Sequence, residues 1–508
     1  MMNRCAHGAV SALAIVAGLA LTPAAALAQP ADTLRVGHWD LPFGRGNPYH
    51  NVYGQPHVYI YPAIFDTLTY LGETGAAAPG LATAWKNVDP TTWQFTLRPN
   101  TVFHNGEPLT SEALVKVIEW FKSEPAKTSP AARSFDYIAS ARAVDAMTVE
   151  FKTTAPRPIF AKQGAALYVV PPKAWAEMGV ENFSTKPIGT GPFKAVTWAG
   201  ESIAMEAARD SWRAPKIAKI DFVKLPEAAA RRQALTSGQI DIMIQVAADD
   251  MAAIRAAGGT VDAVPSPLLL QMAFVLENAS PGVDITALKD KRVRLALNHA
   301  VDKESINKNL LGGVMGINTQ YSVPIASGYN PDLKPFAYDP ALARKLLAEA
   351  GYDKGLKLVV EVRDFPTVFQ QVSLDLAKVG VELEVRPVVN AEWGRKFLNS
   401  KWDGQTFSLT LGVAPENDTL RMMVFQSCRK NPSYYCNRDL MPLVDAADAE
   451  FDLQKRDKML HELMAKMRDD VPAIFLFEQQ EVNAYAKRVR GFKNVNRTPN
   501  YHEVTLAN

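Results

Sequence analysis

The segment from Pro79 to Phe121 constrains the fold most, because its apolar residues change from a strand period to a helix period. Trp93, Phe95 and Leu97 alternate with polar residues, which is typical of a strand with one buried face. Turn residues follow, and Thr110 is then suited to cap a helix whose apolar residues share one face: Leu114, Val117, Ile118 and Phe121. The segment predicts a packed unit of strands and a helix, with no reactive side-chain chemistry.

The N-terminus carries one basic residue, Arg4, and then an apolar run from Ala9 to Leu21 that ends before Ala26-Leu27-Ala28. This run is too short to span a bilayer, which takes about 20 residues. An Ala-x-Ala end fits signal peptidase cleavage better than an uncleaved anchor. We therefore expect residues 1–28 to be a signal peptide, cleaved near Ala28, and the protein to be exported.

The remaining chain, about 480 residues, exceeds what one hydrophobic core usually supports, so two or three domains are expected. The formal net charge of the whole chain is only +2, which gives no sign of a nucleic-acid-binding surface. No other apolar run is long enough to cross a membrane. These features indicate a globular protein without a nucleic-acid partner.

Cys428 and Cys436 are the two cysteines beyond the predicted signal peptide, and the loop between them contains Asn431-Pro432. A pair that closes a short loop in an exported protein favours a disulfide. A metal site is the alternative, but the loop holds no His, and two Cys alone rarely complete a structural site.

The residues from Pro79 to Thr110 also resemble the signature region of family 5 solute-binding proteins of ABC importers, which includes oligopeptide-, dipeptide-, glutathione- and nickel-binding receptors. The resemblance is carried by Pro79, Leu81, Ala82, Trp85, Asp89, Thr92, Phe95, Leu97, Arg98, Phe103, His104, Gly106, Pro108 and Thr110. Similar matches follow at PIGTGPF (187–193), LKDKRVRLALNHAVDKESI (288–306) and YDP…AGY (338–352). The resemblance covers nearly all of the chain after the signal peptide.

This resemblance implies an α/β, periplasmic binding protein type II-like fold, with two lobes of mixed sheets joined by a hinge and an extra subdomain. We place lobe I at residues 29–72, 190–277 and 477–508, the extra subdomain at 73–189, and lobe II at 278–476. From the residues alone, the strand–helix–strand order between Leu358 and Val385 predicts a parallel crossover unit in lobe II.

Sequence motifs give no support for an enzyme. His461-Glu462 lacks the second His of a zinc-protease helix, and the chain has no Gly-x-Ser-x-Gly elbow. We expect no catalytic residue, cofactor or metal site, and we keep a periplasmic hydrolase as the alternative that turnover of a bound compound would reveal.

The segment from Ser408 to Cys428 is the first candidate for ligand contact, because loops at strand ends in α/β clefts commonly touch ligand. In peptide-binding members this loop holds a Trp and an Asp that pairs with the ligand α-ammonium. Here the loop has no Trp, and the expected aspartate position falls on Ala414 or Pro415, close to Glu416 and Asp418. The departure leaves peptide, saccharide, opine-like conjugate, aromatic acid and nickel chelate open as ligand classes, with nickel the least favoured.

The ligand-binding set expected from these considerations combines strand-end, aromatic and charged residues. It comprises Trp39, Asn47, Phe274, Asp364, Gly412, Glu416, Asp418 and Arg421. Arg421 could meet a carboxylate bidentately, and Trp39 could stack on a ligand. The expected protein is a monomeric periplasmic receptor that captures a small solute, peptide or peptide-like in the first instance, and delivers it to an inner-membrane ABC permease.

Overall fold

The computed structural model describes residues 32–50 and 54–507. The predicted signal peptide, residues 1–28, lies outside this described part. Within the described residues, no helix combines the length and the apolar character needed to cross a bilayer.

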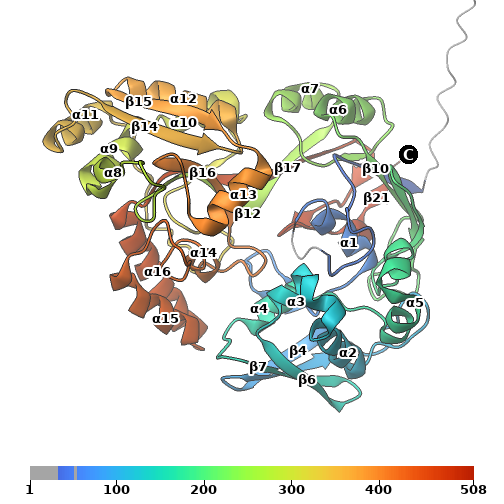
Figure 1. Cartoon of the computed structure of the whole chain (residues 1–508). Helices are drawn as coiled ribbons and strands as arrows, with labels where there is room; N and C mark the ends of the chain where they lie inside the picture. Colours follow the sequence, from blue (N-terminus) through green and yellow to red (C-terminus); the bar gives the residue numbers. More distant parts are fainter. Residues whose placement is uncertain (1–31, 51–53, 508) are drawn as a thin grey trace, which may run out of the picture. The chain divides into compact units, whose positions relative to one another are not determined.

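One large mixed sheet organises the fold (Figure 1). Its strands run in the order β15-β14-β16-β12-β17-β11-β1-β10-β9-β8, with β13 paired to β17 beside this path. The strands of this sheet are β1 (Thr33–His38), β8 (Phe193–Trp198), β9 (Ser202–Ala207), β10 (Lys219–Lys224), β11 (Ile242–Met243), β12 (Thr260–Phe274), β13 (Gly316–Ile317), β14 (Leu356–Val362), β15 (Val381–Pro387), β16 (Thr406–Gly412) and β17 (Ala473–Tyr485).

Helices lie around the strands, and six short strands form three separate two-stranded sheets. The helices are α1 (His57–Ile64), α2 (Ser111–Phe121), α3 (Pro130–Ser134), α4 (Phe160–Gln163), α5 (Pro172–Thr185), α6 (Ala228–Thr236), α7 (Met251–Ala256), α8 (Thr286–Lys289), α9 (Lys291–Ala300), α10 (Lys303–Leu310), α11 (Pro340–Glu349), α12 (Pro366–Ala377), α13 (Asn390–Asn399), α14 (Leu420–Met423), α15 (Met441–Ala449) and α16 (Leu453–Asp470). The short strands are β2 (Thr69–Leu71), β3 (Ala77–Pro79), β18 (Val489–Arg490), β19 (Asn494–Val495), β20 (Thr498–Pro499) and β21 (Thr505–Leu506).

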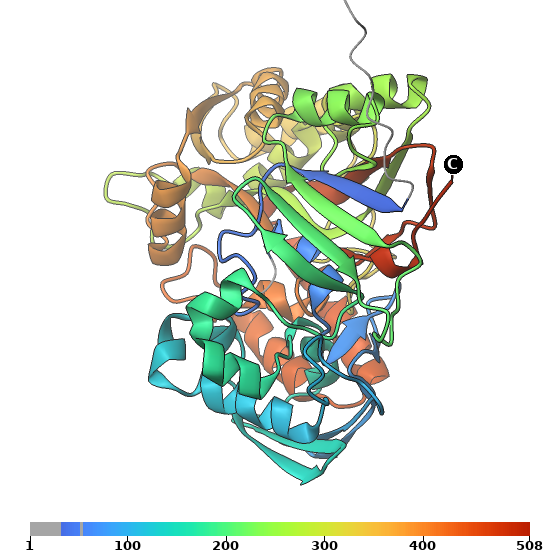
Figure 2. The same cartoon turned by 90° about the vertical axis from the view of Figure 1, so that its right-hand side faces the viewer.

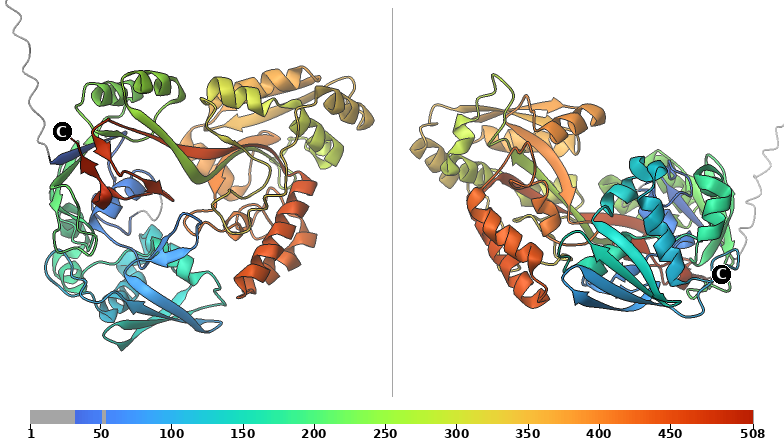
Figure 3. Two further views of the ribbon diagram at one scale, coloured as in Figure 1. Left: turned by 180° about the vertical axis from the view of Figure 1, so that it is seen from behind. Right: turned by 60° about the horizontal axis from the view of Figure 1, so that its bottom comes forward.

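Two long strands, β12 and β17, run through the centre of the sheet as an antiparallel pair (Figure 3, left). At one end Thr260 lies opposite Tyr485, next to β11, and at the other end Ala273 lies opposite Ala473, next to β16. The pairing is irregular between Pro265 and Leu269, where proline removes a ladder donor. In the part of the chain that the structure describes, the β12–β17 pair therefore makes the sheet continuous between the parts predicted as lobe I and lobe II.

Side chains of β17 alternate between two separate apolar clusters. Ile474 and Leu476 pack with β12 and the helices α9 and α12, whereas Phe475 packs on the opposite side with Tyr321 and α16 residues. A period of two with apolar residues on both faces is what a fully covered sheet requires. This part of the sheet is thus buried on both faces.

The strand–helix–strand unit predicted between Leu358 and Val385 is confirmed, since β14 and β15 pair in parallel on either side of α12. Three helices of the same part of the chain begin with aspartate caps. The side chains of Asp290, Asp302 and Asp339 accept hydrogen bonds from the first-turn backbone amides of α9, α10 and α11.

The signature segment supplies two strands and the helix α2 to a second sheet, β4-β5-β7-β6, whose other two strands follow later in the chain. Its strands are β4 (Ala82–Asp89), β5 (Thr92–Leu97), β6 (Ile138–Asp145) and β7 (Thr148–Thr153). The predicted burial of Trp93, Phe95 and Leu97 is confirmed, and α2 starts after Thr110 as predicted. The Thr110 side chain, however, makes no capping hydrogen bond, so the expected cap is wrong in its chemistry.

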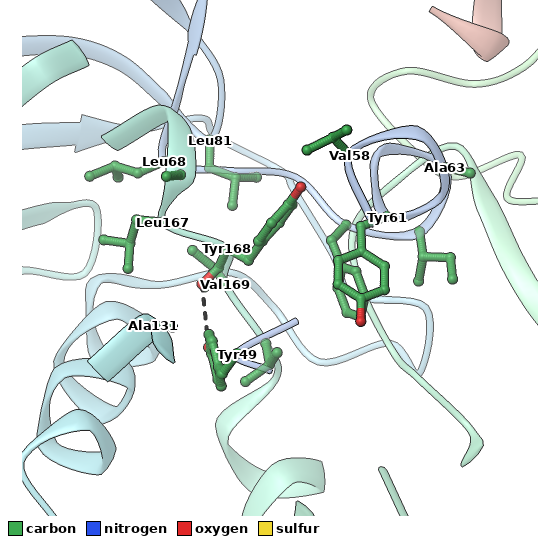
Figure 4. Close-up of a cluster of buried hydrophobic side chains, with 14 of the residues drawn as sticks. Tyr49, Val58, Tyr61, Ala63, Leu68, Leu81, Ala131, Leu167, Tyr168 and Val169 are labelled. Atoms are coloured by element: carbon green, nitrogen blue, oxygen red, sulfur yellow. Dashed lines mark hydrogen bonds between the residues drawn. The ribbon is translucent and has the colours of Figure 1, made fainter. Parts of the chain in front are cut away.

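One buried cluster, rich in aromatic residues, extends from the second sheet to β1. Figure 4 shows the part of this aromatic core around Tyr49 and Tyr61. Tyr49 donates a hydrogen bond to the backbone oxygen of Tyr168, and Leu68, Leu167 and Val169 lie close by. These contacts place the 130–170 part of the chain firmly against α1 and the residues before it.

The glycine-rich segment PIGTGPF crosses against the end of α1. A Cβ on Gly189 would lie 2.0 Å from the backbone oxygen of Ile64, and Gly191 donates a 2.8 Å hydrogen bond to that oxygen. The glycines are therefore required by close backbone approach and not by a phosphate cradle.

The first strand is held by residues from much later in the chain. β1 pairs in parallel with β10 on one side and with β11 on the other, as seen for the blue strand beside the green ones in Figure 2. Arg488 donates to the backbone oxygen of Thr33 at 3.0 Å and to both oxygens of Asp241. The sheet around β1 thus closes only with the C-terminal segment in place.

Candidate functional site

The loop between β16 and α14 is held tightly at its start. A Cβ on Gly412 would lie 1.9 Å from the backbone oxygen of Pro267 on β12. Only glycine tolerates such an approach without backbone movement. Gly412 therefore fixes the direction in which the loop leaves the sheet, close to the irregular stretch of the β12–β17 pair.

Asp418, near the end of this loop, forms a buried ion pair with Arg456 of α16. Arg456 donates to both carboxylate oxygens, at 2.6 and 2.8 Å. Burial alone would raise the pKa of Asp418, but the charge of Arg456 and its hydrogen bonds hold that pKa below the ordinary value. Asp418 also accepts a hydrogen bond from the Leu420 amide, so both of its oxygens are engaged within the fold.

Lys162 connects the second sheet's region to the same loop. Its ammonium group donates to Ser327 Oγ at 2.7 Å and to the backbone oxygen of Asn417 at 2.8 Å. The side chain is buried, and burial lowers the pKa of Lys162. The helix α4 that carries Lys162 also carries Gln163, which this contact brings to the loop.

A cavity of about 440 Å³ lies where α3, α4 and the loop meet. Its wall includes Glu416 from the loop, Arg421 from α14, and Arg133, Tyr137, Arg157 and Gln163 from the 73–189 region. Asp136, Pro130 and Ser134 complete it. Charged and polar side chains from segments almost 300 residues apart thus face one space.

Glu416 is the carboxylate inside this cavity. Burial raises the pKa of Glu416, although the charge of Arg421 and a hydrogen bond from Gln163 act in the opposite direction. Its Oε2 atom is buried and has no hydrogen-bond partner among the residues that the structure describes. A buried, unpaired carboxylate oxygen is costly, so a ligand donor at this position would gain binding energy.

Three residues around Glu416 also have buried polar atoms that lack a hydrogen-bond partner in the described structure. Tyr137 OH, Gln163 Oε1 and Arg157 Nε are buried and find no hydrogen-bond partner within the described chain. The Arg157 guanidinium lies 4.1 Å from the centre of the Tyr137 ring, which fixes its position over that wall. The cavity therefore offers both acceptors and donors that the protein itself leaves unsatisfied.

The structure places the other predicted site residues in varied environments. Trp39 is half-buried and donates to Gln55 Oε1 at 3.4 Å, and Asn47 is buried and accepts from the Tyr49 amide at 3.0 Å. Phe274 is fully buried in an apolar cluster, and Asp364 pairs with Arg363 at 2.9 Å. Of the eight predicted residues, Glu416 and Arg421 line the cavity, and ligand contact by each of the eight stays a prediction.

Seven of the nine residues that line the cavity were not predicted from the sequence, among them Arg133, Tyr137, Arg157 and Gln163. They lie outside the loops that follow apolar strands, and they belong to no sequence motif. Nothing in the sequence indicates which way these side chains point.

Cys428 and Cys436 are joined by a disulfide with a Cα–Cα distance of 4.4 Å. Among the residues described, no group of three or more His, Cys, Asp and Glu side chains is placed to hold a metal ion.

Comparison with known proteins agrees with this architecture. Residues 76–431 match the family described as bacterial extracellular solute-binding proteins, family 5. The chain is 26% identical over 461 residues to the dipeptide-binding protein of Escherichia coli (strain K12), covering 82% of this chain and 84% of the relative. It is 25% identical over 425 residues to the glutathione-binding protein GsiB of Pectobacterium atrosepticum, covering 80% of each.

The fold is similar to that of the oligopeptide-binding protein AppA from Bacillus subtilis, solved in complex with a nonapeptide. The TM-score is 0.72 at 21% identity, over 94% of this chain and 99% of that chain. The match confirms the predicted mixed α/β fold with its extra subdomain. The family match extends over most of the chain, and its members are binding proteins and not enzymes. This chain therefore belongs to family 5 of the bacterial extracellular solute-binding proteins.

Proposed function

We propose that this chain is the periplasmic substrate-binding component of an ABC importer and that it captures a peptide or peptide-like compound. The observation that carries the ligand class is Glu416, a buried carboxylate with an unpartnered oxygen beside the unpartnered carbonyl of Gln163. An ammonium group has three donors and no acceptor, so it complements these two oxygens. The dipeptide- and glutathione-binding names of the relatives point to the same class.

In this proposal the ligand is enclosed between lobe I (29–72, 190–277 and 477–508, with the extra subdomain 73–189) and lobe II (278–476). The β12–β17 pair acts as the hinge, and its irregular pairing between Pro265 and Leu269 is the place where it bends. Closure is favoured only as far as the closed form adds ligand contacts. Gly412 and Asp418 hold the loop, while Glu416 and Arg421 contact the ligand.

The protein acts as a monomer, delivers its ligand to an inner-membrane permease, and neither binds nucleic acid nor alters its ligand chemically. Trp39, Asn47, Asp364 and Phe274 belong to the wider ligand-binding region, with Phe274 acting through the position of β12.

A thermal-shift screen of the mature protein tests the proposal. The panel holds di- and tripeptides, oligosaccharides, opines, aromatic acids and Ni²⁺, and the binding constants of positive compounds are then measured by calorimetry. A ligand at 100 times its dissociation constant adds about 2.7 kcal/mol of stability, which gives a clear shift. We expect peptides or peptide-like compounds to give the shift and to be recovered unaltered.

Two variants make the test specific. Glu416→Gln removes the charge in the cavity and is expected to weaken binding, whereas Glu181→Gln, at an exposed position of α5, is expected to leave it unchanged. Shifts by saccharides or aromatic acids alone would overturn the ligand class, and recovery of a cleaved product would overturn the binding-protein role.

A further inference from the structure

The charges around the Glu416 cavity exceed what a simple peptide amino terminus requires. Three guanidinium groups, those of Arg133, Arg157 and Arg421, line the same wall as two carboxylates, those of Asp136 and Glu416. A ligand end that brings only an ammonium group adds one more cation to a cavity where cations already outnumber anions. The electrostatic balance thus favours an end that carries negative charge as well.

These three arginines keep N–H groups that are not used in hydrogen bonds within the described fold. Arg157 Nε has no hydrogen-bond partner among the described residues, although the group is stacked on Tyr137 and so is held in position. Arg421 is exposed on α14, with its guanidinium 5.6 Å from the centre of the Phe425 ring. Arg133 is exposed on α3 and donates to the backbone oxygen of Thr128 through Nη1. Each retains N–H groups for a ligand, because guanidinium has five donors.

We infer that the cavity selects an α-amino-acid head group, with ammonium and carboxylate on one carbon, that is linked to the rest of the ligand through its side chain. This inference rests on the proposed function and names the substrate class within it. The ammonium donates to Glu416 Oε2 and Gln163 Oε1, and the carboxylate accepts from Arg157 and Arg421.

The ammonium contact and the carboxylate contact both match the hydrogen-bonding groups of the cavity. A guanidinium binds a carboxylate through two parallel N–H donors, which fixes orientation as well as adding energy. Tyr137 OH, buried and unpartnered, can donate to the carboxylate or accept from the ammonium. An α-linked peptide places its first carbonyl where the head-group carboxylate would be, so it satisfies Glu416 but leaves the arginines without an anion.

Two isomers with the same formula test the inference. Both isomers end in a glycine carboxylate, but only γ-L-glutamylglycine also has a free carboxylate on the carbon that carries the ammonium. In α-L-glutamylglycine that carboxylate forms the peptide bond, and the free glutamyl carboxylate is at the end of the side chain. Calorimetric titration of the mature protein is expected to give a dissociation constant about tenfold or more lower for the γ-isomer, as one charge-assisted pair would produce.

Variants of the cavity residues test whether the cavity causes the preference for the γ-isomer. Arg157→Gln and Arg421→Gln are each expected to make the dissociation constants of the two isomers nearly equal. They should do so by weakening the γ-isomer, with little effect on binding of the α-isomer. Glu416→Gln is expected to weaken both isomers. Arg255→Gln, at an exposed position of α7 that is no part of the cavity wall, is the matched control and should retain the full ratio.

The outcomes separate this inference from the proposed function. If α-linked dipeptides bind as tightly as the γ-isomer, or if they bind and the γ-isomer does not, the head-group inference is wrong while the peptide proposal stands. Equal binding of the N-acetylated γ-isomer would also overturn it, because the ammonium would then be irrelevant. If no peptide or peptide-like compound binds, both fail.

Discussion

Two carboxylates of one loop, Glu416 and Asp418, occupy opposite electrostatic situations. Asp418 is almost fully buried, and Arg456 neutralises it with two hydrogen bonds, so its pKa lies below the ordinary value. Glu416 faces a cavity, keeps one buried oxygen without a partner in the described structure, and has a raised pKa because of burial. The first charge is compensated by the protein, and the second is left for something else to compensate.

Because of this difference, a single loop can be held rigidly by the fold and still present a carboxylate to a ligand. Asp418 attaches the loop to α16, and Lys162 attaches the adjacent Asn417 to α4. With its neighbours held on two sides, Glu416 is positioned even though its Oε2 atom has no hydrogen-bond partner among the described residues. Preorganisation of this kind lowers the conformational cost of binding.

The largest effect is expected from breaking the compensated pair. Arg456→Ala leaves Asp418 buried without a counter-charge, and removing one member of a buried ion pair typically costs about 3–5 kcal/mol. Urea denaturation of the ligand-free protein should show a free energy of unfolding lowered by about that amount. A loss below about 1 kcal/mol would mean that water or another cation replaces Arg456 and that the loop is not anchored there.

A smaller effect is expected when the charge of Glu416 is removed. Glu416→Gln removes a charge that burial disfavours, so the free energy of unfolding should stay equal or rise. Ligand affinity should fall by about 1.5–3 kcal/mol, the usual value for a hydrogen bond to a charged group. Denaturation and calorimetry on the same preparation measure both quantities. A destabilised protein with unchanged affinity would reverse the roles assigned to Glu416 and Asp418.

The pH dependence of stability should differ in sign between the two residues. The lowered pKa of Asp418 means that its stabilising contribution is present above its unfolded pKa, about 3.9, and is lost as pH falls through the folded value. The raised pKa of Glu416 means that ionisation above its unfolded pKa, about 4.3, disfavours the folded state.

Unfolding curves between pH 3 and pH 8 check this contrast, with Asp418→Asn and Glu416→Gln compared with the unmodified protein. Relative to that protein, Asp418→Asn should be less stable and Glu416→Gln at least as stable at neutral pH. Both differences should shrink below about pH 4. Parallel curves at all pH values would show that neither carboxylate differs between the folded and unfolded states.

The smallest effect on stability is expected for Arg421, which is exposed on α14. Arg421→Gln should change the free energy of unfolding by less than about 0.5 kcal/mol, as is usual for surface positions. The same denaturation series measures it. A loss as large as that of Arg456→Ala would place Arg421 among the groups that hold the loop.

Much of the fold could be predicted because its determinants are local. The alternation of Trp93, Phe95 and Leu97, and the aspartates that cap α9, α10 and α11, depend on neighbours within one turn or one strand. β4 was missed for a related reason. Most of its side chains are exposed, so its sequence has no apolar period to detect.

The candidate site could be predicted only in part. Glu416 and Arg421 were found because their loop follows an apolar strand, a local signal. Arg157 and Gln163 reach the same cavity through tertiary contacts, namely Lys162 with Asn417 and the aromatic core around Tyr49 and Tyr168. Such contacts leave no pattern in the residues that make them.

The position of β1 has a consequence for the time course of folding. Its partner β10 begins at Lys219, and Arg488, which bonds Thr33, is made near the end of synthesis. At about 5–20 residues per second, β1 waits on the order of 10–40 s for its first neighbouring strand. During that interval the growing chain cannot complete the sheet that contains its own beginning. A polypeptide kept incomplete for so long is well suited to passage through a narrow translocation channel in extended form.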